Sequence, residues 1–172
     1  RIAKVLSRAG ISSRREAERL IELGEVKVNG KTITSPAMNV NAKDKITVRG
    51  EPVGQPEPPR LWLYYKPEGL VTSASDEKGR DTVFDHLPED MPRVMSIGRL
   101  DLNSEGLLLL TNDGALVQRL LHPKHEVERE YHARVRGVPA AEALDRLRRG
   151  VPIAGRRTAP AVVRVLDTGL GA

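Results

Sequence analysis

The sequence predicts an α+β protein made of two small domains joined by a short linker. Residues 1–48 begin with apolar residues at helical spacing and end in short runs rich in β-branched residues. Residues 50–60 hold four prolines and two glycines and show no periodicity, as is typical of a semi-extended linker. From residue 61 onward, expected strands and helices are mixed without a regular βαβ repeat, which favours α+β over a doubly wound sheet.

Composition restricts the class of protein. The chain of 172 residues is 39% hydrophobic, enough for a core, and it contains no stretch approaching the roughly 18 apolar residues of a membrane span. Cysteine is absent, which excludes disulfides and thiolate zinc sites within this chain and fits a reducing compartment. We therefore expect a cytoplasmic protein without a membrane partner.

The positive charge is unevenly distributed. Residues 1–60 hold 12 Lys and Arg against 7 Asp and Glu, whereas residues 61–172 hold 16 of each. The whole net charge of +5 therefore belongs to the first third of the chain. This asymmetry indicates a basic binding module, for which a polyphosphate is the commonest partner, attached to a neutral body.

The first domain is expected to begin with two helices. Apolar residues recur at helical spacing over residues 2–9, and Gly10 ends that helix. Ser13 and Glu16 fit a capping box that starts a second helix, which Gly24 stops. Two helices separated by a tight turn are thus predicted.

A small sheet is expected to follow the helices. Residues 26–28 read as a strand entering a tight hairpin at Asn29-Gly30, and residues 45–48 as a later strand. The domain is therefore predicted as helix, turn, helix and small sheet.

These elements carry a resemblance. The run from Ile2 to Val48, with Ser12-Ser13-Arg14-Arg15-Glu16-Ala17 and Gly24-Glu25-Val26-Lys27-Val28-Asn29-Gly30, resembles an S4 RNA-binding domain. The resemblance implies contacts with RNA phosphate or ribose by Arg8, Arg14, Arg15, Lys27 and Asn29. The alternative for any single cation is a solvated surface charge. We expect the S4 domain to cover residues 1–49, the linker 50–60 and the second domain 61–172.

The second domain is expected to contain six strands and three helical segments. The strands are predicted at residues 61–65, 70–72, 94–97, 107–111, 131–135 and 161–166. The helical segments are predicted at residues 82–87, after a cap at Asp113, and from Pro139 to Gly150 with Leu144 and Leu147 facing inward.

An acidic loop precedes the leucine run of the second domain. Residues 101–106 imitate the start of a calcium loop, but Asn112 stands where a bidentate Glu is needed, so calcium is disfavoured. The histidines around residue 125 do not complete a His-Glu-x-x-His pattern, so no metal site is predicted. A carboxylate such as Asp101 can act without a cofactor if a nearby cation keeps it ionised and water is excluded. A turn-capping Asp101 and a core Tyr131 remain the alternatives at this point.

The motif at residues 98–114 resolves those alternatives by resemblance. Gly98-Arg99-Leu100-Asp101 and the residues up to Gly114 resemble the catalytic motif of RsuA-type RNA pseudouridine synthases. Residues 65–69, 82–85 and 122–131 match further motifs in the same order, so the resemblance runs from residue 2 to about residue 160. The amino-acid sequence of these motifs is most similar to the branch of the family that modifies large-subunit (23S) ribosomal RNA, and next to the branch that modifies small-subunit (16S) ribosomal RNA.

The resemblance implies roles for three residues. Asp101 would act on the ribose of a flipped-out uridine so that the N1–C1′ bond breaks and the uracil rejoins through C5. Tyr131 would stack on the uracil and help remove the C5 proton, and Arg99 would contact RNA near the vacated position or pair with a carboxylate. No metal or organic cofactor is implied, and we expect a monomer. The rival hypothesis is a non-catalytic S4-type RNA-binding protein.

One departure from the family pattern concerns the end of the chain. The family continues with another strand and an arginine-rich segment whose basic residue pairs with the catalytic carboxylate, and this chain ends at Ala172 before it. We therefore expect the second domain to be incomplete at its C-terminus.

Overall fold

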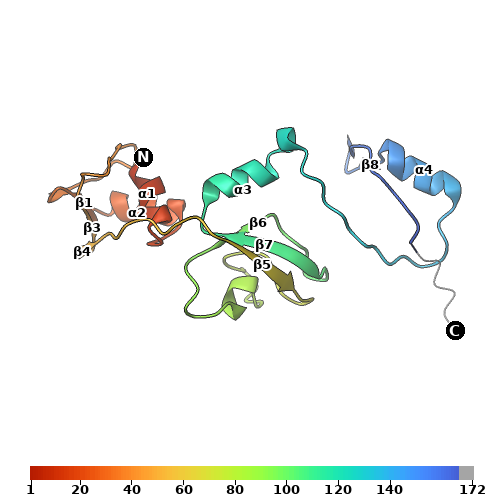
Figure 1. Ribbon diagram of the computed structural model, residues 1–172, viewed down its shortest axis with the longest axis horizontal. Coiled ribbons are helices and arrows are strands. Elements are labelled where there is room, and N and C mark those ends of the chain that lie inside the picture. The colour runs from red at the N-terminus through yellow and green to blue at the C-terminus, as the bar shows by residue number, and fades with distance from the viewer. Residues whose placement is uncertain (167–172) are drawn as a thin grey trace. The chain divides into compact units, whose positions relative to one another are not determined.

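The computed structural model describes residues 1–166, which fall into two compact units, Arg1–Val127 and the residues from Glu128 onward (Figure 1). The first unit opens with two helices and four short strands: α1 (Ile2–Arg8), α2 (Arg14–Glu22), β1 (Val26–Val28), β2 (Lys31–Thr32), β3 (Ile46–Val48) and β4 (Glu51–Pro52).

Both helices begin and end where the local sequence signals place them. The Ser13 hydroxyl accepts a hydrogen bond from the Glu16 backbone N–H at 3.1 Å, so Ser13 caps α2. Gly10 and Gly24, which follow the two helices, have φ of +77° and +72°, a conformation that glycine adopts without a steric penalty. The prediction of two helices separated by a tight turn is confirmed.

The apolar faces of these helices pack on the small sheet. The core is made only of buried aliphatic residues, namely Ile2, Ala3, Leu6, Ala17, Leu20, Ile21, Val26, Val28, Ile46 and Val48. Lys27 lies exposed between two buried valines of β1, as the alternation of a half-buried strand requires.

The sheet has the order β2-β1-β3-β4, and all its strand pairs are antiparallel. β4 corrects the expected linker, because Glu51 and Pro52 pair with Val48 and Thr47 of β3, and Val53 packs on the core. The Arg49-Gly50 turn makes this hairpin possible, since both residues have positive φ, as a two-residue type I′ turn requires. The sheet thus continues into residues whose proline and glycine content indicated a linker.

The rest of the first unit has its own sheet and core. Its elements are β5 (Leu61–Lys66), the 3₁₀ turn η1 (Val83–His86), β6 (Met95–Ile97), β7 (Gly106–Thr111), α3 (Gly114–Leu121) and the 3₁₀ turn η2 (Pro123–His125). The sheet has the order β5-β7-β6 with antiparallel pairs. Of the strand expected at residues 70–72, a single bridge between Val71 and Thr82 is present.

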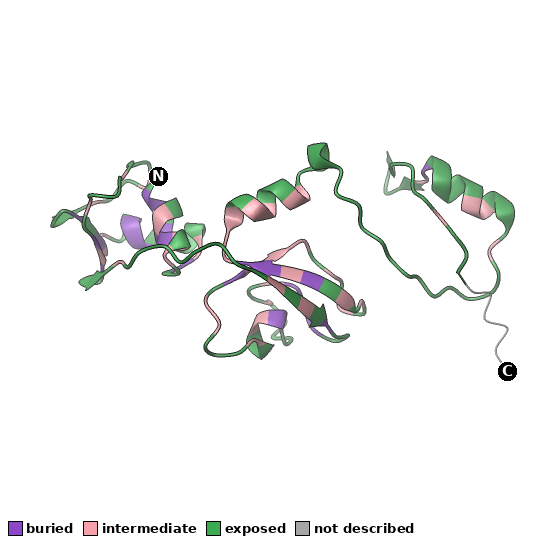
Figure 2. Cartoon of the chain, viewed as in Figure 1, coloured by how far each residue is buried: buried purple, intermediate pink, exposed green. Residues whose placement is uncertain are grey.

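The two faces of this sheet differ in burial, and the alternation along β7 can be followed in Figure 2. On one face, Leu108 and Leu110 are buried and Trp62 and Tyr64 pack beside them. On the other face, the side chains of β5 remain open, and Leu63 is 75% exposed. Because side chains of a strand alternate, Lys66 lies on the same face as Trp62 and Tyr64, and it is fully buried.

The second unit contains α4 (Ala141–Arg149), β8 (Pro152–Ile153) and β9 (Arg156–Arg157). The strands expected at residues 131–135 and 161–166 are wrong, because neither segment pairs with a strand in the described chain. The inward face expected for α4 is also wrong, since Leu147 is 44% exposed and Leu144 is only half-buried. Strand and helix faces of this kind need a packing partner, and within the described part of this unit Gly150 alone is buried.

None of the helices within residues 1–166 has the length and apolarity needed to cross a membrane.

Candidate active site and RNA-contact residues

The Asp101 loop, residues 98–105, connects β6 to β7. These strands are antiparallel neighbours with Ile97 opposite Leu109, so the loop closes a hairpin at one end of the sheet. Gly98 and Gly106 flank the loop with φ of +82° and +123°. The loop turns at Asp101, whose carbonyl accepts a hydrogen bond from the Ser104 N–H at 3.0 Å. The prediction of an acidic loop between two strands is confirmed.

A buried lysine binds the main chain of this loop. The Lys66 ammonium donates hydrogen bonds to the carbonyls of Asp101 at 3.0 Å and Ser104 at 2.7 Å, and to that of Pro67 at 3.0 Å. Burial lowers the pKa of Lys66, and the negative charges of Asp101 and Glu68 oppose that shift. Lys66 lies in the motif matched at residues 65–69, but its burial was not predicted, because two of its acceptors, Asp101 and Ser104, lie 35 and 38 residues further along the chain.

Two further contacts hold the loop on its β5 side. The buried Thr72 hydroxyl donates to the Leu100 carbonyl at 2.9 Å and accepts from the Leu100 N–H at 3.3 Å. The Gly69 N–H donates to the Leu102 carbonyl at 2.8 Å. Every one of these bonds involves the main chain of the loop, so the position of its backbone is fixed independently of the Asp101 side chain.

The Asp101 side chain itself is exposed. Within residues 1–166, no Lys, Arg or His lies within ion-pair distance of its carboxylate, and no side chain donates to it. The first unit taken alone therefore supplies neither the nearby cation nor the exclusion of water that a reacting carboxylate needs. The carboxylate is free to meet a ligand from solvent.

Arg99 and Tyr131 lie in different units. Arg99, in the Asp101 loop, is exposed and makes no ion pair with a carboxylate of the described chain, and both of its predicted roles stay predictions. Tyr131 lies in the second unit, outside any strand, with 69% of its surface exposed. The expected meeting of Asp101 and Tyr131 stays a prediction.

The predicted cations of the first domain are all exposed, and none makes an ion pair within the described chain. They are Arg8 at the end of α1, Arg14 and Arg15 in the first turn of α2, and Lys27 in β1. Unpaired cations of this kind are available to phosphate groups, whereas ion-paired cations must first be released.

Asn29 has a structural task of its own. Its side-chain amide donates to the Asp44 carboxylate at 2.9 Å, and its side-chain oxygen accepts from the Lys45 N–H at 2.9 Å. The Asn41 backbone N–H, and after it the Asn29 amide, lower the pKa of Asp44. These bonds hold the left-handed Asn29 residue in the hairpin turn, and its contact with RNA stays a prediction.

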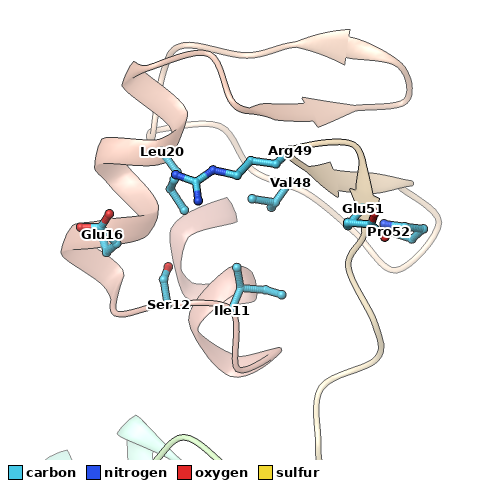
Figure 3. A pocket seen from close by; sticks show the side chains of 8 residues that line it. All are labelled: Ile11, Ser12, Glu16, Leu20, Val48, Arg49, Glu51 and Pro52. Carbon is cyan, nitrogen blue, oxygen red and sulfur yellow. The ribbon is translucent and has the colours of Figure 1, made fainter.

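A shallow hollow of about 360 Å³ lies beside α2 and the β3–β4 hairpin (Figure 3). Its lining consists of Ile11, Ser12, Glu16, Leu20, Val48, Arg49, Glu51 and Pro52. Arg49 forms an ion pair with Glu25. None of the predicted RNA-contact residues lines this hollow, so it is separate from the basic residues described above. The described chain brings together no group of three or more His, Asp or Glu side chains that could hold a metal ion.

The positive φ of Gly106 predicts that a residue with a Cβ at this position lowers the stability of the protein. At φ of +123°, Gly106→Ala strains the backbone although a Cβ there would meet nothing within 4 Å. We expect a loss of roughly 1–3 kcal/mol in the free energy of unfolding, measured by urea denaturation. Gly54→Ala is the matched control, because Gly54 has equal space and no left-handed φ, and it should change stability by less than about 0.5 kcal/mol. Equal effects at both positions would contradict the strain argument.

Both domains of the chain are similar to known protein families. Residues 60–167 match the family described as RNA pseudouridylate synthase, and residues 1–46 match the S4 domain. Ribosomal large subunit pseudouridine synthase B of Bacillus subtilis (strain 168) is 45% identical over 97% of this chain and 68% of its own length. An uncharacterized RNA pseudouridine synthase of Rickettsia felis is 55% identical over 80% of this chain and 59% of its own length.

The fold has a counterpart among solved structures. A structure described as a crystal structure of pseudouridylate synthase aligns with a TM-score of 0.59 at 24% identity, over 98% of this chain and 73% of that one. The chain therefore spans between about three fifths and three quarters of these three proteins.

Proposed function

Since the chain belongs to the RNA pseudouridylate synthase family, we propose that the full-length protein converts a uridine of ribosomal RNA into pseudouridine. The hydrogen bonds around Asp101 support this residue as the one that reacts. The Asp101 carbonyl accepts hydrogen bonds from Lys66 and the Ser104 N–H, and Thr72 holds Leu100 just before it. The Asp101 carboxylate is exposed and has no protein partner among residues 1–166. A fixed backbone positions a nucleophile or base for reaction, and an unpartnered carboxylate is available to a bound RNA.

The proposed reaction rearranges one nucleotide without a net change in atoms. The target uridine leaves the base stack, because its N1 and C1′ atoms are inaccessible in stacked RNA. Asp101 acts on the ribose as nucleophile or base, the N1–C1′ bond breaks, and the uracil turns so that C5 bonds to C1′. The C5 proton then leaves and a proton is taken up at N1. In this proposal Tyr131 stacks on the uracil and helps remove the C5 proton, and Arg99 contacts the RNA at the vacated position.

We assign the substrate to the large subunit, because the relative that covers nearly all of this chain is named as a ribosomal large subunit pseudouridine synthase B. In this proposal residues 1–53 form an S4 domain that contacts structured RNA, residues 54–60 a linker, and the chain from residue 61 onward the catalytic domain. A monomer acting on ribosomal RNA in the cytoplasm completes the proposal.

The test is pseudouridine formation on 23S and 16S ribosomal RNA made without modifications, read at nucleotide resolution. We expect the full-length protein to form pseudouridine at one position of 23S RNA. Product in 16S RNA alone would favour the small-subunit substrate. Binding to both RNAs without product would favour the rival, a non-catalytic S4-type RNA-binding protein.

A further inference from the structure

Lys66 is a buried charge that the proposed reaction does not use. It is fully buried at the end of β5, opposite Gly106 in the register of the sheet. Lysine is almost never fully buried unless its charge is compensated. Removing an ammonium from water costs several kcal/mol in a protein interior, so its retention calls for a physical reason.

The hydrogen bonds of Lys66 match its chemistry completely. An ammonium has three N–H donors and no acceptor, and Lys66 has three carbonyl acceptors, those of Pro67, Asp101 and Ser104. The hydrogen bonds that compensate the charge therefore all come from main-chain carbonyls, and the charges of Asp101 and Glu68 add to them at longer range. The described chain contains no buried side-chain polar atom without a partner, so this site is fully satisfied.

Two of the three acceptors come from one turn far along the chain. Asp101 and Ser104 lie 35 and 38 residues after Lys66, and the Ser104 N–H closes the turn on the Asp101 carbonyl. A single ammonium thus ties the first and last residues of a four-residue turn to the end of β5. Rotation of the Asp101 main chain would break at least one of these bonds.

We propose that Lys66 is a positioning residue, whose buried ammonium fixes the Asp101 turn and thereby aims the Asp101 carboxylate at the ribose. This inference rests on the proposed role of Asp101. An apolar side chain of similar length would fill the same space with a smaller desolvation cost. It would remove the donor of the Pro67 and Ser104 carbonyls and leave the Asp101 carbonyl only its bond from the Ser104 N–H, so the turn would lose its tie to β5.

The first experiment separates chemistry from binding. In the full-length protein, Lys66→Met should lower the single-turnover rate of pseudouridine formation at least about tenfold, because small misplacements of a reacting group cost one to two orders of magnitude. The Kd for RNA should change less than about twofold, since Lys66 is not exposed. Val83→Ala, in the same core without a bond to the loop, is the control for lost stability and should keep the rate per folded molecule.

The second experiment restores the charge. Residues 1–172 contain no cysteine. Once any cysteine elsewhere in the full-length protein is replaced by serine, Lys66→Cys can be alkylated in denaturant at position 66 alone and refolded. Alkylation with 2-bromoethylamine returns an ammonium of nearly the same length, whereas 1-bromopropane returns an uncharged side chain of similar size. We expect the aminoethyl form to regain most of the single-turnover rate and the propyl form to stay as slow as Lys66→Met.

Three results would overturn the inference. They are an unchanged rate in folded Lys66→Met protein, an equal loss of rate in Val83→Ala, and equal rescue by the propyl and aminoethyl groups. Asp101→Asn measured in parallel distinguishes the two levels of the proposal. Inactive Asp101→Asn with fully active Lys66→Met refutes only the positioning role, whereas active Asp101→Asn refutes the proposed function.

Discussion

Asp101→Asn will abolish pseudouridine formation by the full-length protein, lowering the single-turnover rate by roughly a thousandfold or more. Asparagine keeps the size and shape of the side chain but cannot act as an anionic nucleophile or a base. The main chain at Asp101 is held by Lys66 and Ser104, so the turn should survive the substitution. The side chain is exposed, so stability should change by less than about 0.5 kcal/mol.

Glu105→Gln supplies the matched control for this prediction. Glu105 is an exposed carboxylate in the same loop, and its substitution removes the same charge. We expect its rate to stay within about threefold of the wild type, because loss of one exposed charge is a small electrostatic change. The Kd for RNA should be nearly unchanged in both variants. Product formation by Asp101→Asn at the wild-type rate would show that Asp101 does not perform the chemistry.

The double substitution Arg14→Gln and Arg15→Gln will weaken RNA binding by about tenfold at moderate salt and reduce its salt dependence. Both arginines are exposed in the first turn of α2 and lack ion-pair partners in the described chain. If both contact phosphate, the slope of log Kd against log salt concentration should fall by about 1.5. The measurement is Kd at four or more salt concentrations, with the single-turnover rate at saturating protein as a second readout.

A control with the same change of charge tests whether position matters. Lys43→Gln and Arg49→Gln also remove two positive charges from the first domain, but Arg49 is ion-paired to Glu25 and borders the shallow hollow. This pair should weaken binding by less than about threefold, through the general field of the domain. Equal losses in the two double variants would mean that only net charge matters and that α2 has no special contact with RNA.

The elements that the sequence predicted correctly are those fixed by local interactions. Ser13 caps α2 through a residue only three positions away, and the Asn29-Gly30 turn sets the β1–β2 hairpin. The local pattern around Asp101 predicted only an acidic loop before a strand of leucines, and the resemblance of residues 98–114 to a family motif was needed to single out Asp101.

The features that the sequence did not predict depend on distant partners. The burial of Lys66 results from acceptors 35 and 38 residues away, and the task of Asn29 from Asp44, 15 residues away. β4 was mistaken for linker because its proline lies at the edge of a sheet, where a missing N–H is tolerated. The strands expected at residues 131–135 and 161–166 have suitable residues but no pairing strand in the described structure.

The register of β5 against β7 has a chemical meaning beyond packing. Side chains of a strand alternate between faces, so the pairing of Lys66 with Gly106 decides that a charge rather than a phenol lies beneath the Asp101 turn. Inserting or deleting one residue within β5 would exchange the two faces of the strand and bring Tyr65 to the buried side. Inserting or deleting two residues would keep each side chain on its present face. Whether the Asp101 loop has a lysine beneath it therefore depends on whether the number of residues along β5 is odd or even.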